Sequence, residues 1–150
     1  MNELKAYKND LKSLFASQHT GVLATQQDGQ PYTSLVAFTS SEDLKDLFFA
    51  TMRATRKYAN LSPDSRVSML VDNRSNVPSD FQWAMGVTAT GRAEELTDPE
   101  RQTSLTAYLA KHPHLKDFVS SPGCAFLRIR VDTYYVVTRF QKVVEIHIRS

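Results

Sequence analysis

The sequence has very little cysteine and no long apolar segment. Its single cysteine, Cys124, has no second cysteine with which to form an internal disulfide. No apolar run approaches the roughly 20 residues that a membrane helix needs. The first 15 residues carry charges throughout, unlike the apolar centre of a secretory signal. These absences predict a reduced, cytoplasmic protein without a membrane segment.

An excess of charge of one sign is also absent. The 18 Lys and Arg against 16 Asp and Glu give a net charge of +2, which is too small to indicate a nucleic-acid-binding protein. One alternative is a single-strand nucleic-acid platform, because aromatic and cationic residues interleave near the C-terminus. These residues are Arg128, Arg130, Tyr134, Tyr135 and Arg139. The low net charge and the missing RNA-binding signatures argue against it, so we expect no nucleic-acid partner.

Signatures of metal sites and of catalytic nucleophiles are missing as well. His112 and His114 have the spacing of a ligand pair, but no carboxylate or cysteine cluster accompanies them. We therefore interpret them as surface histidines at a helix end and expect no metal. No cation adjoins Cys124 to activate it, so a small buried residue is expected there. The sequence assigns no catalytic residue.

The apolar pattern predicts one domain over residues 1–150, mainly β with flanking α-helices. Apolar residues at three- and four-residue spacing predict a helix over residues 3–17 that covers the core. Short alternating or apolar runs predict antiparallel strands that close into a small barrel. The expected strands are residues 20–26, 31–39, 47–50, 66–71 and 83–94, and two or three more finish the chain at residues 125–131, 134–140 and 143–148.

Local signals refine this outline. Asp28-Gly29 predicts a tight hairpin turn, and Gly86 and Gly91 predict a bulge or a close approach within a strand. Residues 74–82 are expected to form a loop. Thr97 is predicted to cap a helix that ends near Lys111, with Glu100 closing the capping box.

The junction between the strand at 47–50 and a short helix ending before Pro63 is rich in hydroxyls and cations. Thr51, Thr55, Arg56 and Lys57 lie within seven positions. The first N–H groups of a helix lack partners and carry partial positive charge, so such a junction suits a phosphate. The alternative is a solvated basic helix face, and the residues alone leave both possibilities open.

Four segments resemble the pyridoxamine 5′-phosphate oxidase family of FMN-binding split β-barrels. They are DGQPYTSLVAF (28–38), FFATMRATRK (48–57), SRVSMLV (65–71) and VTATGRAEELT (87–97). Their order and spacing match over about half of the chain. The resemblance implies an antiparallel split barrel that binds FMN, with the flavin against residues 34–38 and its phosphate at residues 55–57.

The resemblance and the local chemistry together predict a set of cofactor-binding residues. For Trp83 the alternatives are an aromatic wall over the flavin or ordinary core packing, and Arg139 is expected to reach the flavin from the partner subunit. The predicted set is Ser34, Leu35, Val36, Ala50, Thr51, Thr55, Arg56, Lys57, Trp83 and Arg139.

The sequence departs from the family oxidases at several positions. Ser34 replaces an arginine, Thr39 a lysine, Gly86 a glutamine and Val137 a tryptophan. We therefore expect an FMN-dependent oxidoreductase acting on an unidentified small molecule rather than on pyridoxamine phosphate. The alternatives are a non-catalytic flavin- or haem-binding module and a deazaflavin-dependent reductase.

A homodimer is also expected. The strand at residues 31–38 carries apolar side chains on both faces, and only two substantial helices are available to cover the barrel. A second subunit would supply the missing cover, and the family resemblance implies the same arrangement.

Overall fold

The structure is a computed structural model that describes the backbone of residues 2–149 and the side chains of residues 3–149. The strands are β1 Thr20–Gln27, β2 Gln30–Ser40, β3 Asp46–Met52, β4 Arg66–Asp72, β5 Met85–Glu95, β6 Cys124–Thr138 and β7 Lys142–His147. The helices are α1 Asn2–Ser17, α2 Arg56–Leu61, α3 Asp80–Trp83, α4 Glu100–Lys111, the 3-10 turn η1 Pro113–Leu115, and α5 Lys116–Ser120.

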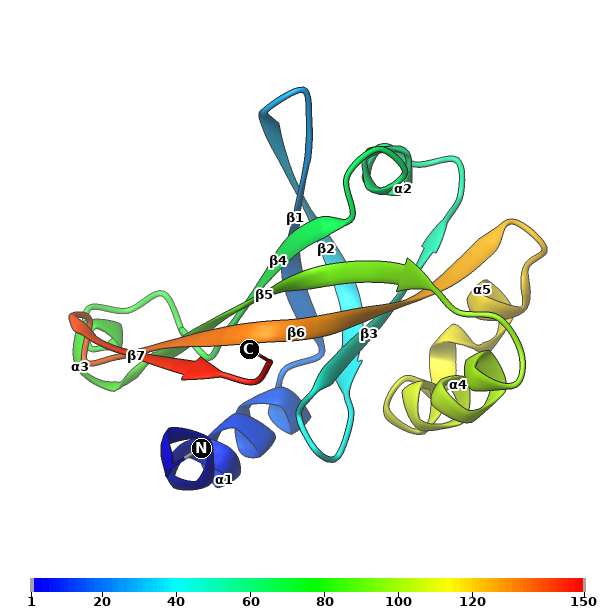
Figure 1. Cartoon of the computed structure of the whole chain (residues 1–150). Coiled ribbons are helices and arrows are strands. Elements are labelled where there is room, and N and C mark those ends of the chain that lie inside the picture. Colours follow the sequence, from blue (N-terminus) through cyan, green and yellow to red (C-terminus); the bar gives the residue numbers. More distant parts are fainter. Residues whose placement is uncertain (1, 150) are drawn as a thin grey trace.

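The strands form one antiparallel sheet that closes on itself. Its order is β3-β2-β1-β4-β5-β6-β7, and β3 also pairs with β6, which closes the first six strands into a barrel (Figure 1). Strand β7 extends the sheet beyond the closure by pairing with the last part of β6. The expected mainly β, antiparallel barrel with flanking helices is confirmed.

Strand β6 corrects the prediction of two separate strands at residues 125–131 and 134–140. It runs unbroken for 15 residues, pairing with β3 in its first half and with β7 in its second. A bulge lies between them, because Thr90 pairs with Thr133 while Gly91 pairs with Val131, which leaves Asp132 without a partner on β5. The bulge absorbs the extra residue, so the strand continues through residues 132 and 133, where the prediction had a break.

Gly91 is needed at this bulge. A Cβ atom there would lie 2.1 Å from the carbonyl oxygen of Arg130 on the neighbouring strand. The close approach predicted for this glycine is confirmed. The hairpin predicted at Asp28-Gly29 is also present, with φ angles of 52° and 82° that suit a tight two-residue turn.

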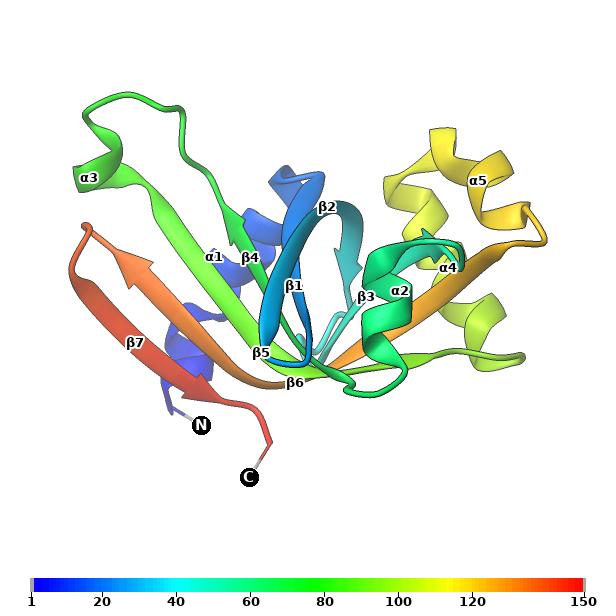
Figure 2. The same ribbon diagram turned by 90° about the horizontal axis from the view of Figure 1, so that it is seen from above.

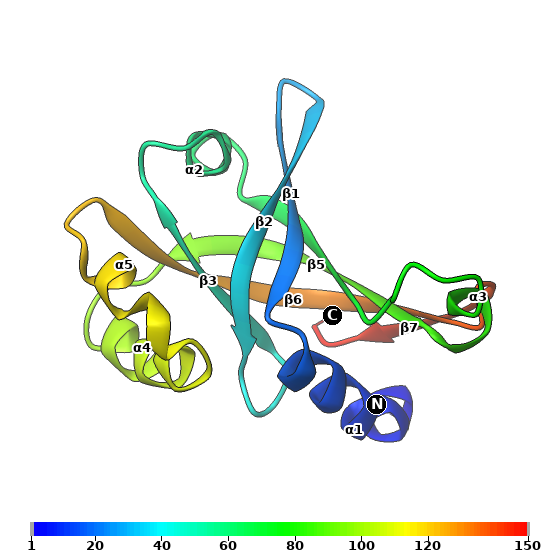
Figure 3. The same ribbon diagram turned by 180° about the vertical axis from the view of Figure 1, so that it is seen from behind.

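The core has two parts. Inward-facing strand residues fill the barrel, and α1 closes one end of it with Leu11, Leu14 and Phe15, all of them buried (Figure 3). Phe15 meets Phe38 of β2 edge to face, with ring centroids 5.7 Å apart. A second, smaller cluster lies beneath α4 and α5, where Phe48 of β3 is one of the buried residues. The predicted role of α1 as a cover for the core is confirmed.

Two element boundaries differ from the prediction. Trp83 lies in α3 rather than at the start of a strand, because the Asp80 carboxylate accepts backbone N–H bonds from Ser75, Asn76 and Val77 and folds this loop into a turn. None of the helices described here is long and apolar enough to cross a membrane.

The start of α4 also differs from the expected capping box. Its first residue is Glu100, it is preceded by Pro99, and no side chain caps it, so the cap predicted at Thr97 is wrong. The Glu100 carboxylate instead accepts a hydrogen bond of 3.0 Å from Arg128 on β6. Glu100 thus forms an ion pair with Arg128 of β6 in place of the predicted hydrogen bond to the backbone at Thr97.

Candidate functional site

A cavity of about 320 Å³ lies between β2, β3, the start of α2 and the α4–α5 region. Figure 2 shows α2, α4 and α5 gathered at this end of the barrel. Its walls are mostly apolar, and hydroxyl and ammonium groups lie at one end. The lining residues are Leu35, Val36, Ala37, Ala50, Thr51, Met52, Thr55, Lys57, Tyr108, Leu115 and Phe118. A mostly apolar cavity with a few polar groups is typical of a cofactor site.

The polar end is organised by Thr55. This residue has an extended backbone and caps α2, where its hydroxyl oxygen accepts the N–H of Tyr58 at 3.4 Å. The same hydroxyl donates to the carbonyl of Met52 at 2.8 Å and lies 3.1 Å from the hydroxyl of Thr51. The two hydroxyls therefore lie side by side at the N-terminus of α2. Rotation about the Cβ–Oγ bond can turn the hydroxyl hydrogen of either residue toward a ligand.

Lys57 supplies the charge at this end. Its side chain is half-buried, and no carboxylate among residues 3–149 lies within ion-pairing distance of it. Arg53, by contrast, is already occupied: it pairs with Glu95 at 2.5 Å and donates to the Pro122 carbonyl at 3.1 Å. Of these two cations, only Lys57 is available to a ligand in the cavity.

Arg56 faces a different space. Its side chain borders a second cavity of about 440 Å³, together with Asp28, Tyr32 and Asn60. Consecutive residues of a helix point about 100° apart, so Arg56 and Lys57 diverge from the same turn. The structure therefore places the two predicted phosphate ligands on different sides of the start of α2.

Three other predicted residues lie outside the 320 Å³ cavity. The Ser34 hydroxyl is buried without a hydrogen-bond partner, and only its neighbours Leu35 and Val36 border the cavity. Trp83 and Arg139 meet at a separate cavity of about 350 Å³ at the opposite end of the barrel, where α3 lies (Figure 1). Trp83 is 74% exposed, so core packing is wrong for this residue.

Some residues of the cavity were not predicted from the sequence. Tyr108 of α4 donates its hydroxyl to the carbonyl of Ala37 on β2 at 3.0 Å, which fixes the helix against the cavity wall. Burial raises the pKa of Tyr108, so the phenol stays neutral. Phe118 of α5 completes the apolar wall. The sequence places these residues only on helix faces, and the packing of α4 and α5 brings them to the site.

The histidine prediction needs a correction. His114 is exposed, but His112 is only 1% exposed and its Nε2 lies 2.7 Å from the carbonyl oxygen of Phe38. Burial lowers the pKa of His112, with smaller contributions from Lys111, His19 and His114, and the carbonyl bond partly opposes this. His112 is therefore a neutral structural residue whose N–H donates to β2.

This arrangement predicts a pH dependence of stability. Because the pKa of His112 is lower in the folded state than its ordinary value of 6.5, the unfolded chain binds more protons below that pH. Its contribution is complete above pH 6.5 and is lost as pH falls toward the folded-state pKa. Urea unfolding across this range should show a smaller loss in His112→Gln, whose amide can still donate to Phe38. The exposed His147→Gln is the control, and equal slopes in both variants would contradict the assignment.

The groups considered for other chemistry are engaged elsewhere. Tyr134 is buried and donates its hydroxyl to the Leu44 carbonyl at 2.7 Å, so its ring cannot stack on a nucleic acid base. Arg128 is held by Glu94 and Glu100. Cys124 is buried as predicted, and burial raises the pKa of its thiol. Within the described residues, no three side chains of metal-ligating type gather at one place.

Comparison with known proteins finds one family whose model covers both the barrel strands and the α2 junction. The sequence matches the family described as pyridoxamine 5′-phosphate oxidase over residues 8–138, which includes the strands of the cavity and the residues of the α2 junction. The chain belongs to this family. The resemblance proposed from four short segments is therefore confirmed. A search of the curated proteins found no match.

Solved structures share the fold at low identity. A haem-binding protein from Mycobacterium smegmatis superposes with a TM-score of 0.80 at 20% identity, covering 91% of this chain and 55% of that one. An FAD-binding protein from Mesorhizobium loti has a TM-score of 0.69 at 21% identity, with coverages of 86% and 90%. General Stress Protein 26 from Bacillus anthracis has a TM-score of 0.69 at 18% identity, with coverages of 94% and 98%. This chain thus spans about half the length of the mycobacterial protein, and these similarities show the fold alone.

Proposed function

We propose that this chain binds FMN in the 320 Å³ cavity and works as an FMN-dependent oxidoreductase on a small molecule. The observation that carries the proposal is the layout of the cavity: an apolar slot lined by two hydroxyls and by the Lys57 ammonium group, which no carboxylate among residues 3–149 pairs. A flat aromatic ring suits the slot, and a phosphate suits the polar end. Family membership supports the same assignment.

Individual residues of the chain have distinct tasks in this proposal. The main chain at Leu35 and Val36 borders the ring, and Thr51, Thr55 and Lys57 hold the phosphate. The buried walls of the cavity exclude water from the enclosed side of the ring, and Leu35 leaves the other side open to a partner subunit. The flavin supplies the redox chemistry when bound, while the protein supplies position and electrostatics.

FMN is favoured over FAD because the cavity has one polar end and the sequence lacks a glycine-rich dinucleotide fingerprint. FAD and haem are the competing ligands, since proteins with the same fold are described as binding each of them.

A binding panel tests the cofactor. The apoprotein is titrated in parallel with FMN, FAD, haem and a deazaflavin, following flavin fluorescence and haem absorption. We expect FMN to bind most tightly, with one site per chain. Tighter binding of FAD or haem would overturn the cofactor assignment and leave the fold unaffected.

The substrate is proposed to be a small molecule other than pyridoxamine phosphate. Ser34 and Thr39 replace cations that the resemblance places in the family oxidases, and neither side chain offers a charge. A panel of reduced nicotinamides and small acceptors, scored by bleaching of bound flavin, tests turnover. Oxidation of pyridoxamine phosphate at a rate typical of enzymes would contradict this part of the proposal.

We also propose a homodimer in which each subunit completes its partner's site. Leu35 borders the cavity yet is 71% exposed, which leaves the apolar wall without cover on one side. At the opposite end of the barrel, Trp83, Phe81 and Phe140 are exposed, and the rings of Phe81 and Phe140 contact edge to face with their centroids 4.9 Å apart. Two-fold pairing would bring such an aromatic group to the partner's open cavity.

Trp83→Ala tests this geometry. Trp83 is the last residue of α3, which lies at the opposite end of the barrel from α2, α4 and α5 (Figures 1 and 2), so the substitution should affect FMN only through a partner. We expect FMN affinity to fall about five- to tenfold, as for loss of one aromatic contact, with no change in melting temperature. Val77→Ala, in the same exposed region, is the control. Sedimentation should give a dimer at micromolar concentration; a monomer that retains full FMN affinity would contradict the shared site.

A further inference from the structure

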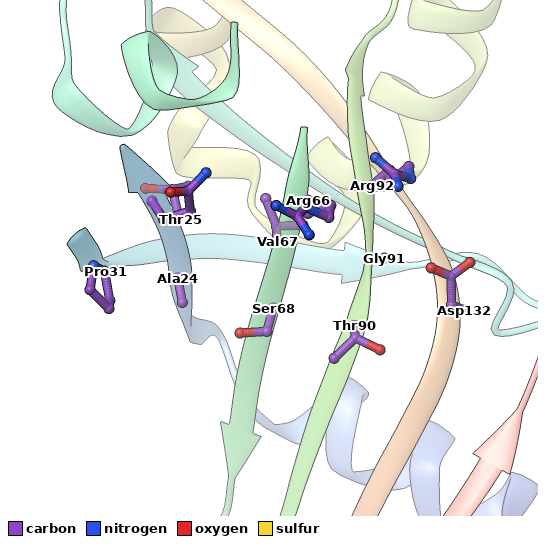
Figure 4. Close-up of a pocket in the computed structure, with 11 residues that line it drawn as sticks. Ala24, Thr25, Pro31, Arg66, Val67, Ser68, Thr90, Gly91, Arg92 and Asp132 are labelled. Carbon is purple, nitrogen blue, oxygen red and sulfur yellow. The ribbon is translucent and has the colours of Figure 1, made fainter. Parts of the chain in front are cut away.

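A hollow on the outer face of the sheet lies away from the proposed cofactor cavity. It measures about 430 Å³ and is bordered by residues of β1, β2, β4, β5 and β6 (Figure 4). None of its lining residues borders the 320 Å³ cavity. The small side chain of Ala24 on β1, opposite Ser68, leaves room for the hollow. It has the size of a small-molecule site and no assigned role.

The strand register places four polar side chains in a compact array on this face. Arg66 of β4 lies directly opposite Arg92 of β5, and two residues further along Ser68 lies opposite Thr90. Figure 4 shows the two arginines side by side at one end, with Ser68 and Thr90 beyond them. Two guanidinium groups beside two hydroxyls can donate hydrogen bonds to the oxygen atoms of a phosphate or carboxylate group.

Arg92 is in an unfavourable position without a ligand. It faces Arg66 on one neighbouring strand and Arg130 on the other, and like charges directly opposite destabilise a sheet. Arg66 is paired with Asp64 through Nε at 3.0 Å and Nη2 at 2.6 Å, which leaves its Nη1 group for a ligand, and Arg130 is paired with Glu94 at 3.7 Å. Arg92 has no carboxylate within 4.0 Å among residues 3–149. An anion in the hollow would relieve this repulsion.

A carboxylate borders the same hollow. Asp132 is the extra residue of the β6 bulge, and the bulge turns it to the space beside Gly91 (Figure 4). In the described part of the chain, no cation lies within 4.0 Å of the Asp132 carboxylate. The hollow therefore presents a cation and an anion that do not pair with each other.

We infer that this hollow binds a small zwitterion. Its phosphate or carboxylate lies between Arg66 and Arg92 and accepts from Ser68 and Thr90, while its protonated amine lies at Asp132. A simple anion would meet repulsion from Asp132, and a simple cation would meet two arginines. The apolar surface of Ala24 and Pro31 contacts the carbon chain between the two charges.

Two matched probes test the inference: 2-aminoethyl phosphate, which is zwitterionic, and ethyl phosphate, which lacks the amine. The full chain, saturated with FMN, is titrated with each while the backbone amide signals of Gly91 and Asp132 are followed by NMR. These amides report on the outer hollow only. We expect saturable shifts with both probes and about tenfold tighter binding of 2-aminoethyl phosphate, the gain from one charge-assisted contact.

Three variants assign the contacts. Arg92→Gln should remove saturable binding of both probes, and its melting temperature at low salt should stay equal or rise because like-charge repulsion is lost. Asp132→Asn should bind the two probes equally. Arg74→Gln, an exposed arginine paired with Asp72 outside the hollow, should behave as the parent protein. Equal affinity of the parent for both probes, no saturation below about 20 mM, or unchanged binding in Arg92→Gln would overturn the inference.

Discussion

Replacing Lys57 by alanine is expected to weaken FMN binding about 100-fold, which corresponds to roughly 2.7 kcal/mol. Lys57 is the cation at the polar end of the cavity, and no described carboxylate competes for it. A charge-assisted contact to a phosphate dianion would therefore be lost outright. The double variant Arg56→Ala/Lys57→Ala should lose several kcal/mol of binding free energy, with Lys57 contributing the larger part because Arg56 borders another cavity.

The controls separate a local contact from a change in overall charge. Lys142→Ala removes an exposed lysine of β7 at the other side of the molecule and should leave the FMN affinity unchanged. Both lysine variants should keep the melting temperature of the apoprotein, since Lys57 contacts the proposed ligand and not the core. If Lys57→Ala still purifies with full FMN occupancy, the phosphate lies elsewhere.

Gly91→Ala is expected to be the most destabilising single substitution on β5. The added Cβ would stand 2.1 Å from the Arg130 carbonyl oxygen, which is backbone and cannot turn away like a side chain. The β5–β6 register would have to shift, with loss of the ladder bonds around the bulge. We expect the free energy of unfolding to fall by more than about 3 kcal/mol, above the usual range for an overpacked core, because the clash is with backbone.

Gly86→Ala is the matched control on the same strand. Its nearest neighbour for an added Cβ is the Asp72 side chain at 3.9 Å, an ordinary contact. Urea unfolding should show a change within about 1 kcal/mol for this variant. Similar losses in both variants would mean that the bulge at Gly91 does not set the register.

The strands of this fold follow from local pattern where one face alone meets the core. In β4, Val67, Met69 and Val71 alternate with Arg66, Ser68 and Leu70, and the structure buries the first three and leaves the others at least partly exposed. The same argument fails at β6, where partner exchange and a bulge carry the chain past Asp132. The continuation of β6 depends on its pairing with β5, and a short segment of sequence around Asp132 carries no information about that pairing.

The residues of the candidate site likewise fall into those that local sequence predicts and those that only the tertiary structure brings together. Thr51, Thr55 and Lys57 lie within seven positions of the sequence, and all three line the same cavity in the structure. The directions of Arg56 and Lys57 depend on where the helix begins, a boundary that propensity does not set to within one residue. Tyr108 and Phe118 reach the cavity through helix packing, so no sequence motif could predict their place in the site.

A crystal structure of the chain grown with FMN tests the central claim most directly. We predict that the ring lies along β2 at Leu35 and Val36, with the phosphate within hydrogen-bonding distance of Thr51, Thr55 and Lys57. Electron density for FMN in another cavity of the molecule, or a phosphate without contact to Lys57, would contradict the account.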